Sequence, residues 1–150
     1  MSVAMKDRPT TARERTSAAP EVLLEHVNVT VADPDATARL LGDLFGWRVR
    51  WSGESKMNGY SVHVGGAGSY LALYRGPRQR RLPPEGGERA SYGVIGGLNH
   101  IAVVVSDIED AEARVRAAGI EPYSFGDYEP GLRFYFNDPD GIEYEVVAYP

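Results

Sequence analysis

The chain contains no cysteine among its 150 residues. This absence excludes disulfide bonds, zinc–thiolate sites and cysteine nucleophiles. The chain also lacks an apolar run of the roughly 20 residues that cross a bilayer, so we expect no membrane partner. Positive charge is not in excess either. The net charge of −5 argues against nucleic acid as a partner, because phosphate binding needs a basic face. A cytoplasmic location is expected.

An internal repeat is the strongest pattern that is present. When the two copies are aligned, His26 matches His100. The β-branched residues that follow alternate with the period of a strand in both copies. Each segment ends in an aspartate, Asp33 or Asp107, which suits the N-cap of a helix. In the first copy Pro34 follows, at a position where proline starts helices well.

The same order of elements is predicted in both copies. A helix follows each aspartate and ends near Gly46 or Gly119. Three further strands complete each copy, at 47–51, 59–64 and 69–75 in the first and at 120–124, 133–137 and 142–148 in the second. The predicted fold is α+β, with two tandem βαβββ modules that form a curved mixed sheet around a central cleft.

The module boundaries follow from this repeat. Residues 1–20 are predicted to be a disordered tail, and the modules occupy residues 21–75 and 98–150. Residues 76–97 form a linker or flap that carries four arginines. The linker is predicted to be either a solvated connection or an arm that recognises an anionic substrate.

Two histidines in matching register indicate a metal site. Extending the register to the last strand places Glu145 over Ala72, so one module supplies a carboxylate and the other cannot. The predicted ligands are therefore His26, His100 and Glu145. Such a set leaves coordination positions open for a chelating substrate, and it suits Fe²⁺ best, with Mn²⁺, Zn²⁺, Co²⁺ or Ni²⁺ as alternatives. The competing interpretation is that Glu143 and Glu145 face solvent on an edge strand.

These motifs resemble the vicinal oxygen chelate superfamily, which includes glyoxalase I, fosfomycin-resistance proteins, extradiol dioxygenases and bleomycin-binding proteins. The resemblance rests on EHVNVTV at 25–31, LNHIAV at 98–103 and FYFNDPDGIEYE at 134–145. It implies metal ligation by His26, His100 and Glu145. Glyoxalase I and methylmalonyl-CoA epimerase use a fourth protein ligand where this chain has Ala72, so the resemblance favours the members with three ligands.

The resemblance also implies two catalytic residues. Tyr135 stands ten residues before Glu145, where extradiol dioxygenases and fosfomycin-resistance enzymes have a tyrosine that faces the substrate. His63, the remaining histidine, is the candidate acid or base of a dioxygenase. Its face is uncertain from the sequence, because a one-residue slip reverses every side chain of a strand.

The function expected from these features is that of a divalent-metal-dependent enzyme. Extradiol-dioxygenase-like chemistry is the leading subclass. The substrate would be a small molecule with adjacent oxygens, and Tyr70 and Tyr74 would help to bind it. One alternative is a thiol transferase of the fosfomycin-resistance type, and a lyase or isomerase activity of the glyoxalase-like group also stays open. Another is a metal-free protein that binds an aromatic or cationic drug between tyrosines and tryptophans. A homodimer is expected in either case, with a cleft that two chains can share.

Overall fold

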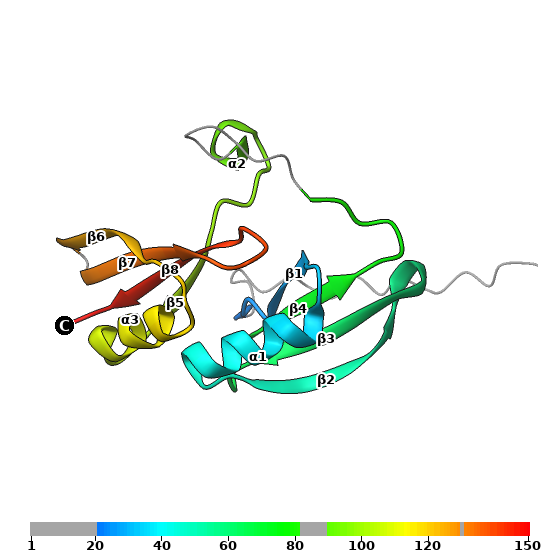
Figure 1. Ribbon diagram of the computed structural model, residues 1–150, viewed down its shortest axis with the longest axis horizontal. Coiled ribbons are helices and arrows are strands. Elements are labelled where there is room, and N and C mark those ends of the chain that lie inside the picture. Colours follow the sequence, from blue (N-terminus) through cyan, green and yellow to red (C-terminus); the bar gives the residue numbers. More distant parts are fainter. Residues whose placement is uncertain (1–20, 82–89, 130) are drawn as a thin grey trace, which may run out of the picture.

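Two four-stranded mixed sheets form the framework of the protein (Figure 1). The structure, a computed structural model, describes residues 21–81, 90–129 and 131–150. The first module contains β1 (His26–Thr30), α1 (Pro34–Phe45), β2 (Arg48–Ser55), the 3₁₀ turn η1 (Lys56–Asn58), β3 (Gly59–Gly65) and β4 (Tyr70–Arg75). The predicted tail at 1–20 lies outside the described residues.

The second module repeats this order after the short helix α2 (Ala90–Gly93). Its elements are β5 (Ile101–Val104), α3 (Ile108–Ala117), β6 (Tyr123–Tyr128), β7 (Gly131–Asn137) and β8 (Glu143–Ala148). The strand orders β1-β4-β3-β2 and β5-β8-β7-β6 correspond, and the first strand of each sheet pairs in parallel with the last. The predicted α+β class with two βαβββ modules is confirmed, as two separate sheets.

Helices α1 and α3 begin directly after the two predicted capping residues, Asp33 and Asp107. The Asp33 carboxylate accepts hydrogen bonds from the backbone N–H groups of Asp35 and Ala36, each at 3.1 Å, and Asp107 accepts one from Asp110 at 2.9 Å. These bonds satisfy amide groups that have no partner within a first helical turn. Gly46 ends α1 in the left-handed conformation with φ of 68°, which costs glycine no Cβ clash.

The start predicted for the second strand of the second module was wrong. The strand predicted at 120–124 begins at Tyr123 and continues to Tyr128. The backbone N–H of Ile120 donates to the Val115 carbonyl at 3.2 Å, so residue 120 still belongs to the turn that closes α3. Pairing with β7 begins only at Tyr123, opposite Tyr135. In the same way β2 is longer than the strand predicted at 47–51, because its pairing with β3 continues to Ser55.

One hydrophobic core joins the modules through their helix-bearing faces. Helices α1 and α3 contact each other, and Figure 1 shows them side by side. The Phe45 ring at the end of α1 lies 6.2 Å from Phe136 and 6.4 Å from Tyr144, both in the second sheet. The Arg114 guanidinium of α3 donates to the Asp43 carbonyl of α1 at 3.3 Å. The opposite face of each sheet, called the open face below, is therefore turned away from this junction.

The start of the linker is tied to both modules. The Asp140 carboxylate, in the turn between β7 and β8, accepts a hydrogen bond from the Ala32 backbone N–H at 3.1 Å and pairs with Arg81 at 3.2 Å. Arg81 thus pairs with a carboxylate of the protein itself. Residues 82–89 of the linker lie outside the described part, so its predicted role as an arm for an anionic substrate stays a prediction. Among the described helices, none has the length and apolar composition needed to cross a bilayer.

Candidate functional site

The open faces of the two sheets carry the predicted site residues in equivalent positions. On the first sheet His26 pairs with Tyr70, and Asn28 pairs with Ala72. On the second sheet Ala102 pairs with Glu145. Since Asn28 and Ala102 are equivalent residues of the repeat, Ala72 and Glu145 occupy equivalent positions, as the sequence register predicts.

His100 and Glu145 meet on the open face of the second sheet. The His100 Nε2 atom lies 3.0 Å from Oε2 of Glu145. The other carboxylate oxygen of Glu145 accepts a hydrogen bond from the Arg133 guanidinium at 3.0 Å. Glu145 is only 7% exposed, so this carboxylate is held by two cationic or ionisable neighbours rather than by bulk water.

A second carboxylate, Glu143, lies on the other side of the same imidazole. The Tyr92 hydroxyl, from α2 in the linker, lies 3.0 Å from His100 Nδ1 and donates to Glu143 Oε1 at 2.6 Å. The Tyr123 hydroxyl of β6 donates to the other oxygen of Glu143. Both nitrogens of His100 therefore have a defined neighbour, a phenol at Nδ1 and a carboxylate at Nε2.

Tyr135 lies beside this group. Its ring meets the His100 ring edge to face at 5.7 Å and stacks on Tyr123 at 6.2 Å. Burial, and after it the negative charge of Glu145, raises the pKa of the Tyr135 phenol above its usual value. The phenol therefore stays protonated at neutral pH, so it can donate a hydrogen bond to a bound molecule.

The open face of the first sheet carries a row of neighbouring rings, called the ring ladder below, which consists of His26, Tyr70, His63 and Trp51. The His26 and Tyr70 rings stack at 4.9 Å, the Tyr70 and His63 rings at 4.7 Å, and Trp51 lies 4.9 Å from His63. His63 pairs with Ala72 in the register, which puts it on the same face as His26. The face of His63 was the uncertain point from the sequence, and the structure assigns it to the open face, at the position equivalent to Tyr135.

The electrostatics of this ladder favour a neutral His63. Burial lowers the pKa of the His63 imidazole, and the neighbouring His26 lowers it further. His26 is held by Glu25, whose carboxylate lies 2.9 Å from Nδ1. The Arg50 guanidinium lies 4.7 Å from the centre of the Tyr70 ring, as in a cation–π contact.

The two predicted substrate-binding tyrosines have different surroundings. Tyr70 lies within the ladder, between His26 and His63. The Tyr74 hydroxyl donates to the Lys56 carbonyl at 3.0 Å, and its ring packs against Gly59 and Gly76. Tyr74 thus uses its only hydroxyl proton in a hydrogen bond to the turn after β2. Its contacts are those of a structural residue.

The structure does not bring the three predicted metal ligands together within one chain. His26 contacts Glu25, Tyr70 and His63, while His100 contacts Glu145 and its neighbours on the other sheet. Across the described residues, no three histidine, aspartate or glutamate side chains are grouped so as to hold a metal ion. The modules join through their helix-bearing faces, which separates the two open faces.

The donors on the second sheet nevertheless fit a divalent cation. An imidazole Nε2 and a carboxylate oxygen approach the same point, and both are ordinary ligands of Fe²⁺, Zn²⁺ and Mn²⁺. The other ring nitrogen of His100 is oriented by Tyr92, as the second nitrogen of a metal-bound histidine usually is by a polar group. His100 and Glu145 are two of the three predicted ligands.

Sequence reasoning missed Tyr92, Tyr123 and Arg133, which contact His100 or the two carboxylates. Arg133 and Tyr135 are two residues apart on β7, so strand alternation could have placed Arg133 on the open face. Tyr123 lies opposite Tyr135 and could have been found once β6 was placed correctly. No local signal indicates that Tyr92 of the linker reaches His100.

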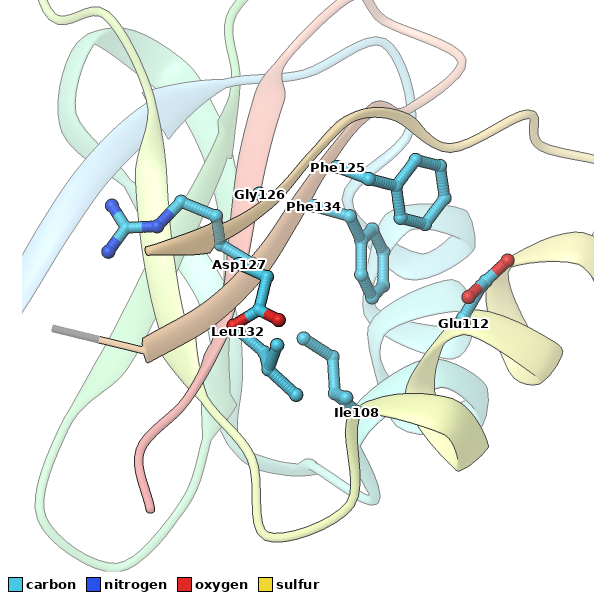
Figure 2. Close-up of a pocket in the computed structure, with 8 residues that line it drawn as sticks. Ile108, Glu112, Phe125, Gly126, Asp127, Leu132 and Phe134 are labelled. Atoms are coloured by element: carbon cyan, nitrogen blue, oxygen red, sulfur yellow. The ribbon is translucent and has the colours of Figure 1, made fainter. Parts of the chain in front are cut away.

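A separate hollow of about 280 Å³ lies on the helix-bearing side of the second sheet. Figure 2 shows Ile108 of α3 facing Leu132 and Phe134 of β7, with Phe125 of β6 above them. Phe134 alternates along β7 with Tyr135, so the hollow and the His100 site are on opposite faces of the sheet. It contains none of the predicted site residues.

Two βαβββ modules with a histidine at the head of each and a glutamate on the last strand define a protein of the vicinal oxygen chelate class. A family model for the Glyoxalase/Bleomycin resistance protein/Dioxygenase superfamily matches residues 23–146. The chain belongs to this superfamily, and the predicted resemblance is confirmed. No curated protein matches the chain.

Solved structures with the same fold have diverse functions. A glyoxylase/bleomycin resistance protein/dioxygenase domain from Frankia sp. EAN1pec has a TM-score of 0.69 at 21% identity, covering 87% of this chain and 100% of that one. The antibiotic-binding protein TnmS3 from Streptomyces sp. CB03234 has a TM-score of 0.67 at 17% identity, covering 89% and 100%. The fosfomycin resistance protein FosX from Listeria monocytogenes has a TM-score of 0.64 at 19% identity, covering 88% and 96%. At these identities the likeness is one of fold.

Proposed function

We propose that the protein is a divalent-metal-dependent enzyme that acts on a small molecule with two adjacent oxygens, and that two chains of a homodimer build each metal site. The observation that carries the proposal is the approach of His100 Nε2 and Glu145 Oε2 to 3.0 Å on an open sheet face. The partner subunit would supply the third ligand, its His26. A cytoplasmic location is part of the same proposal.

The separation of the donors supports a shared site. Each open face carries part of the ligand set, and within one chain the junction of α1, α3 and Phe45 keeps the two faces apart. The open faces also expose apolar side chains, since Trp51 is 47% exposed and Val104 is 68% exposed. Pairing the first sheet of one chain with the second sheet of another would cover these side chains and would complete the ligand set.

Two imidazoles and one carboxylate leave coordination positions free. This set suits Fe²⁺ best, with Mn²⁺, Zn²⁺, Co²⁺ or Ni²⁺ as alternatives. The metal would act as a Lewis acid, or as an oxygen-activating centre, for a substrate that chelates it. Extradiol-dioxygenase-like cleavage is the leading subclass of this proposal.

The neighbouring residues would act on the substrate. Tyr135, a neutral phenol beside His100, would donate a hydrogen bond to a substrate oxygen. A partner that brings His26 would also bring His63, because the centres of the two rings are 6.4 Å apart. The lowered pKa of His63 leaves it neutral at physiological pH, which is the state that a general base requires. Tyr70 would contact the flat face of the substrate.

The test is complementation between two defective subunits. His26→Ala and His100→Ala subunits would be given different tags, mixed by co-expression and purified as the doubly tagged dimer. Each variant alone should lose zinc binding by calorimetry. With shared sites, the mixed dimer regains one intact site of the two, because one interface combines His26 of one subunit with His100 and Glu145 of the other.

His63→Ala is the matched control, because it removes the third histidine of the chain and none of the proposed ligands. It should bind zinc as the wild type does. Wild-type binding by His100→Ala would refute the metal site. Loss of binding by both single variants with no recovery in the mixed dimer would refute the shared site.

A second candidate function is drug binding without a metal. The ring ladder of Trp51, His63 and Tyr70 favours it, because stacked rings offer a flat platform for a planar aromatic ligand. The net charge of −5 would favour a cationic drug. Binding of such a drug that is unchanged by EDTA, together with no binding of divalent ions, would favour this candidate over the enzyme. The thiol-transfer alternative stays a prediction.

A further inference from the structure

In the first module, Tyr60 spans the space between the sheet and the start of the helix. Its hydroxyl, from β3, donates to the Asp35 carboxylate in the first turn of α1 at 2.9 Å. The Arg75 guanidinium lies 6.0 Å from the centre of the Tyr60 ring. On the same helix, Pro34 is fully buried and Ala38 is only 4% exposed. An aromatic ring with a polar group thus connects the sheet to the helix at this point.

The second module has a leucine at the position of this tyrosine. His63 and Tyr135 are equivalent, so Tyr60, three residues earlier on its strand, corresponds to Leu132. Leucine lacks both the length and the hydroxyl of tyrosine, and Leu132 is 42% exposed. The hollow of about 280 Å³ lies at this point, lined by Leu132 of β7 and by Ile108 at the start of α3. It is therefore the space that the first module spans with its own tyrosine.

Apolar side chains form most of the lining of the hollow (Figure 2). The Phe125 and Phe134 rings stack at 5.8 Å, and Phe125 is 56% exposed. Together with Ile108 and Leu132, these rings offer a surface against which a further aromatic ring can pack. The volume lies just below the roughly 300–1,000 Å³ of pockets for drug-sized ligands, so it suits a ligand with a single ring.

The polar part of the lining is acidic. Asp127 of β6 and Glu112 of α3 both line the hollow. Glu112 pairs with Arg116 at 2.9 Å, whereas Asp127 has no hydrogen-bond or ion-pair partner within the described part of the chain. Among the described lining residues only Arg133 is cationic, and its guanidinium pairs with Glu145 on the other face of the sheet at 3.0 Å. The charge left without a partner at the hollow is therefore negative.

We propose that this hollow is a second binding site, which takes a small molecule with one aromatic ring and a cationic amine. The ring packs against Phe125 and Phe134, and the amine pairs with Asp127, much as the Tyr60 ring and hydroxyl connect β3 to Asp35 in the first module. An anionic group in the same place would be repelled by Asp127. The site does not depend on a metal, and it lies on the face of the sheet opposite His100.

The experiment is a titration of the full chain with phenethylamine, followed by the amide signals in proton–nitrogen NMR spectra. The amine is charged at neutral pH, as a lysine side chain is. Binding should saturate with a Kd of about 1 mM or tighter, and the shifts should be confined to β6, β7 and α3. Phenylacetate, which carries a carboxylate in place of the amine, should bind at least about tenfold more weakly.

Leu132→Tyr is the most specific variant, because it copies the tyrosine of the first module into the second. Its ring should occupy the hollow and abolish the phenethylamine shifts. Glu109 is the equivalent of Asp35 in the repeat, so the new hydroxyl has a carboxylate to bind, and Tm should equal or exceed that of the wild type.

Two carboxamide variants test the charge. Asp127→Asn should weaken phenethylamine binding about three- to tenfold, because the amine loses a charged acceptor at an exposed position. Glu54→Gln is the matched control. Glu54 pairs with Tyr60 as Asp127 pairs with Leu132, so it is the equivalent residue beside the space that Tyr60 spans, and binding should stay as in the wild type.

Three results would overturn the inference. The first is the absence of saturable phenethylamine binding by the wild type, and the second is equal affinity for phenylacetate. The third is unchanged binding by folded Leu132→Tyr; should that variant unfold, equal effects of Asp127→Asn and Glu54→Gln would decide against the site in its place. Dissociation of a dimer by Leu132→Tyr, without phenethylamine binding by the wild type, would identify a second copy of the chain as the occupant and would also overturn it.

Discussion

Replacing Arg133 by methionine should destabilise the metal-free protein by about 3 kcal/mol. Arg133 donates to Glu145 at 3.0 Å, and the two side chains are 14% and 10% exposed. Removal of one partner from a buried ion pair costs about 3–5 kcal/mol, because the remaining charge stays desolvated. Glu145 keeps its contact with His100 Nε2 at 3.0 Å, so we expect the lower end of that range. Methionine preserves much of the apolar stem of the side chain, while the contact of the guanidinium with the Tyr128 ring at 4.7 Å is lost with the charge.

The assay is urea unfolding of metal-free protein, followed by tryptophan fluorescence. The expected loss corresponds to a decrease in Tm of about 10 °C for a domain of this size. Arg114→Met is the matched control. Arg114 also pairs with a carboxylate, Asp110 at 2.7 Å, but the two side chains are 52% and 55% exposed. Loss of this pair and of the 3.3 Å bond to the Asp43 carbonyl should cost less than about 1 kcal/mol. Equal effects of the two substitutions would refute the argument that burial of the Arg133–Glu145 pair controls its contribution.

Three more predictions concern single positions. Leu41→Ala should lower the free energy of unfolding by about 3 kcal/mol in urea denaturation, because Leu41 is completely buried, and a loss below about 1 kcal/mol would contradict its place in the core. Gly141→Ala should cost about 1 kcal/mol in the same assay through backbone strain alone, because φ is 80° and a Cβ there would meet nothing within 4 Å; an unchanged stability would refute it. Ala72→Glu should raise zinc affinity about tenfold, or 1.4 kcal/mol, in a competition titration by adding a fourth donor beside His26, and no gain would argue against the proposed site.

Local patterns accounted for most of the fold. The repeated strand alternation and the capping aspartates, Asp33 and Asp107, predicted both modules, because strand pairing and helix capping depend on neighbours a few residues apart. The equivalence of Ala72 and Glu145 was also correct, since it required only a count of residues along paired strands. The start of β6 at Tyr123 was misplaced because the turn after α3 includes Ile120, whose apolar character resembles that of a strand residue.

The composition of the His100 site depended on contacts between segments that no local pattern connects. Tyr92 reaches His100 from a linker, and Tyr123 and Arg133 come from two neighbouring strands to the carboxylates of β8. The face of His63 required the register of β3 against β4, because one residue of slip would have reversed it.

The sequence alone determined that the chain has two equivalent modules, each led by a histidine, and that Glu145 has no counterpart in the first module. Tertiary structure decided which side chains share a site. His100 and Glu145 meet because β5 and β8 are neighbours in one sheet, whereas His26 lies on the other sheet with its own ring ladder. The physical reason is that strand periodicity specifies which face a side chain occupies, while the packing of α1 against α3 and of Phe45 against the second sheet decides which faces can meet.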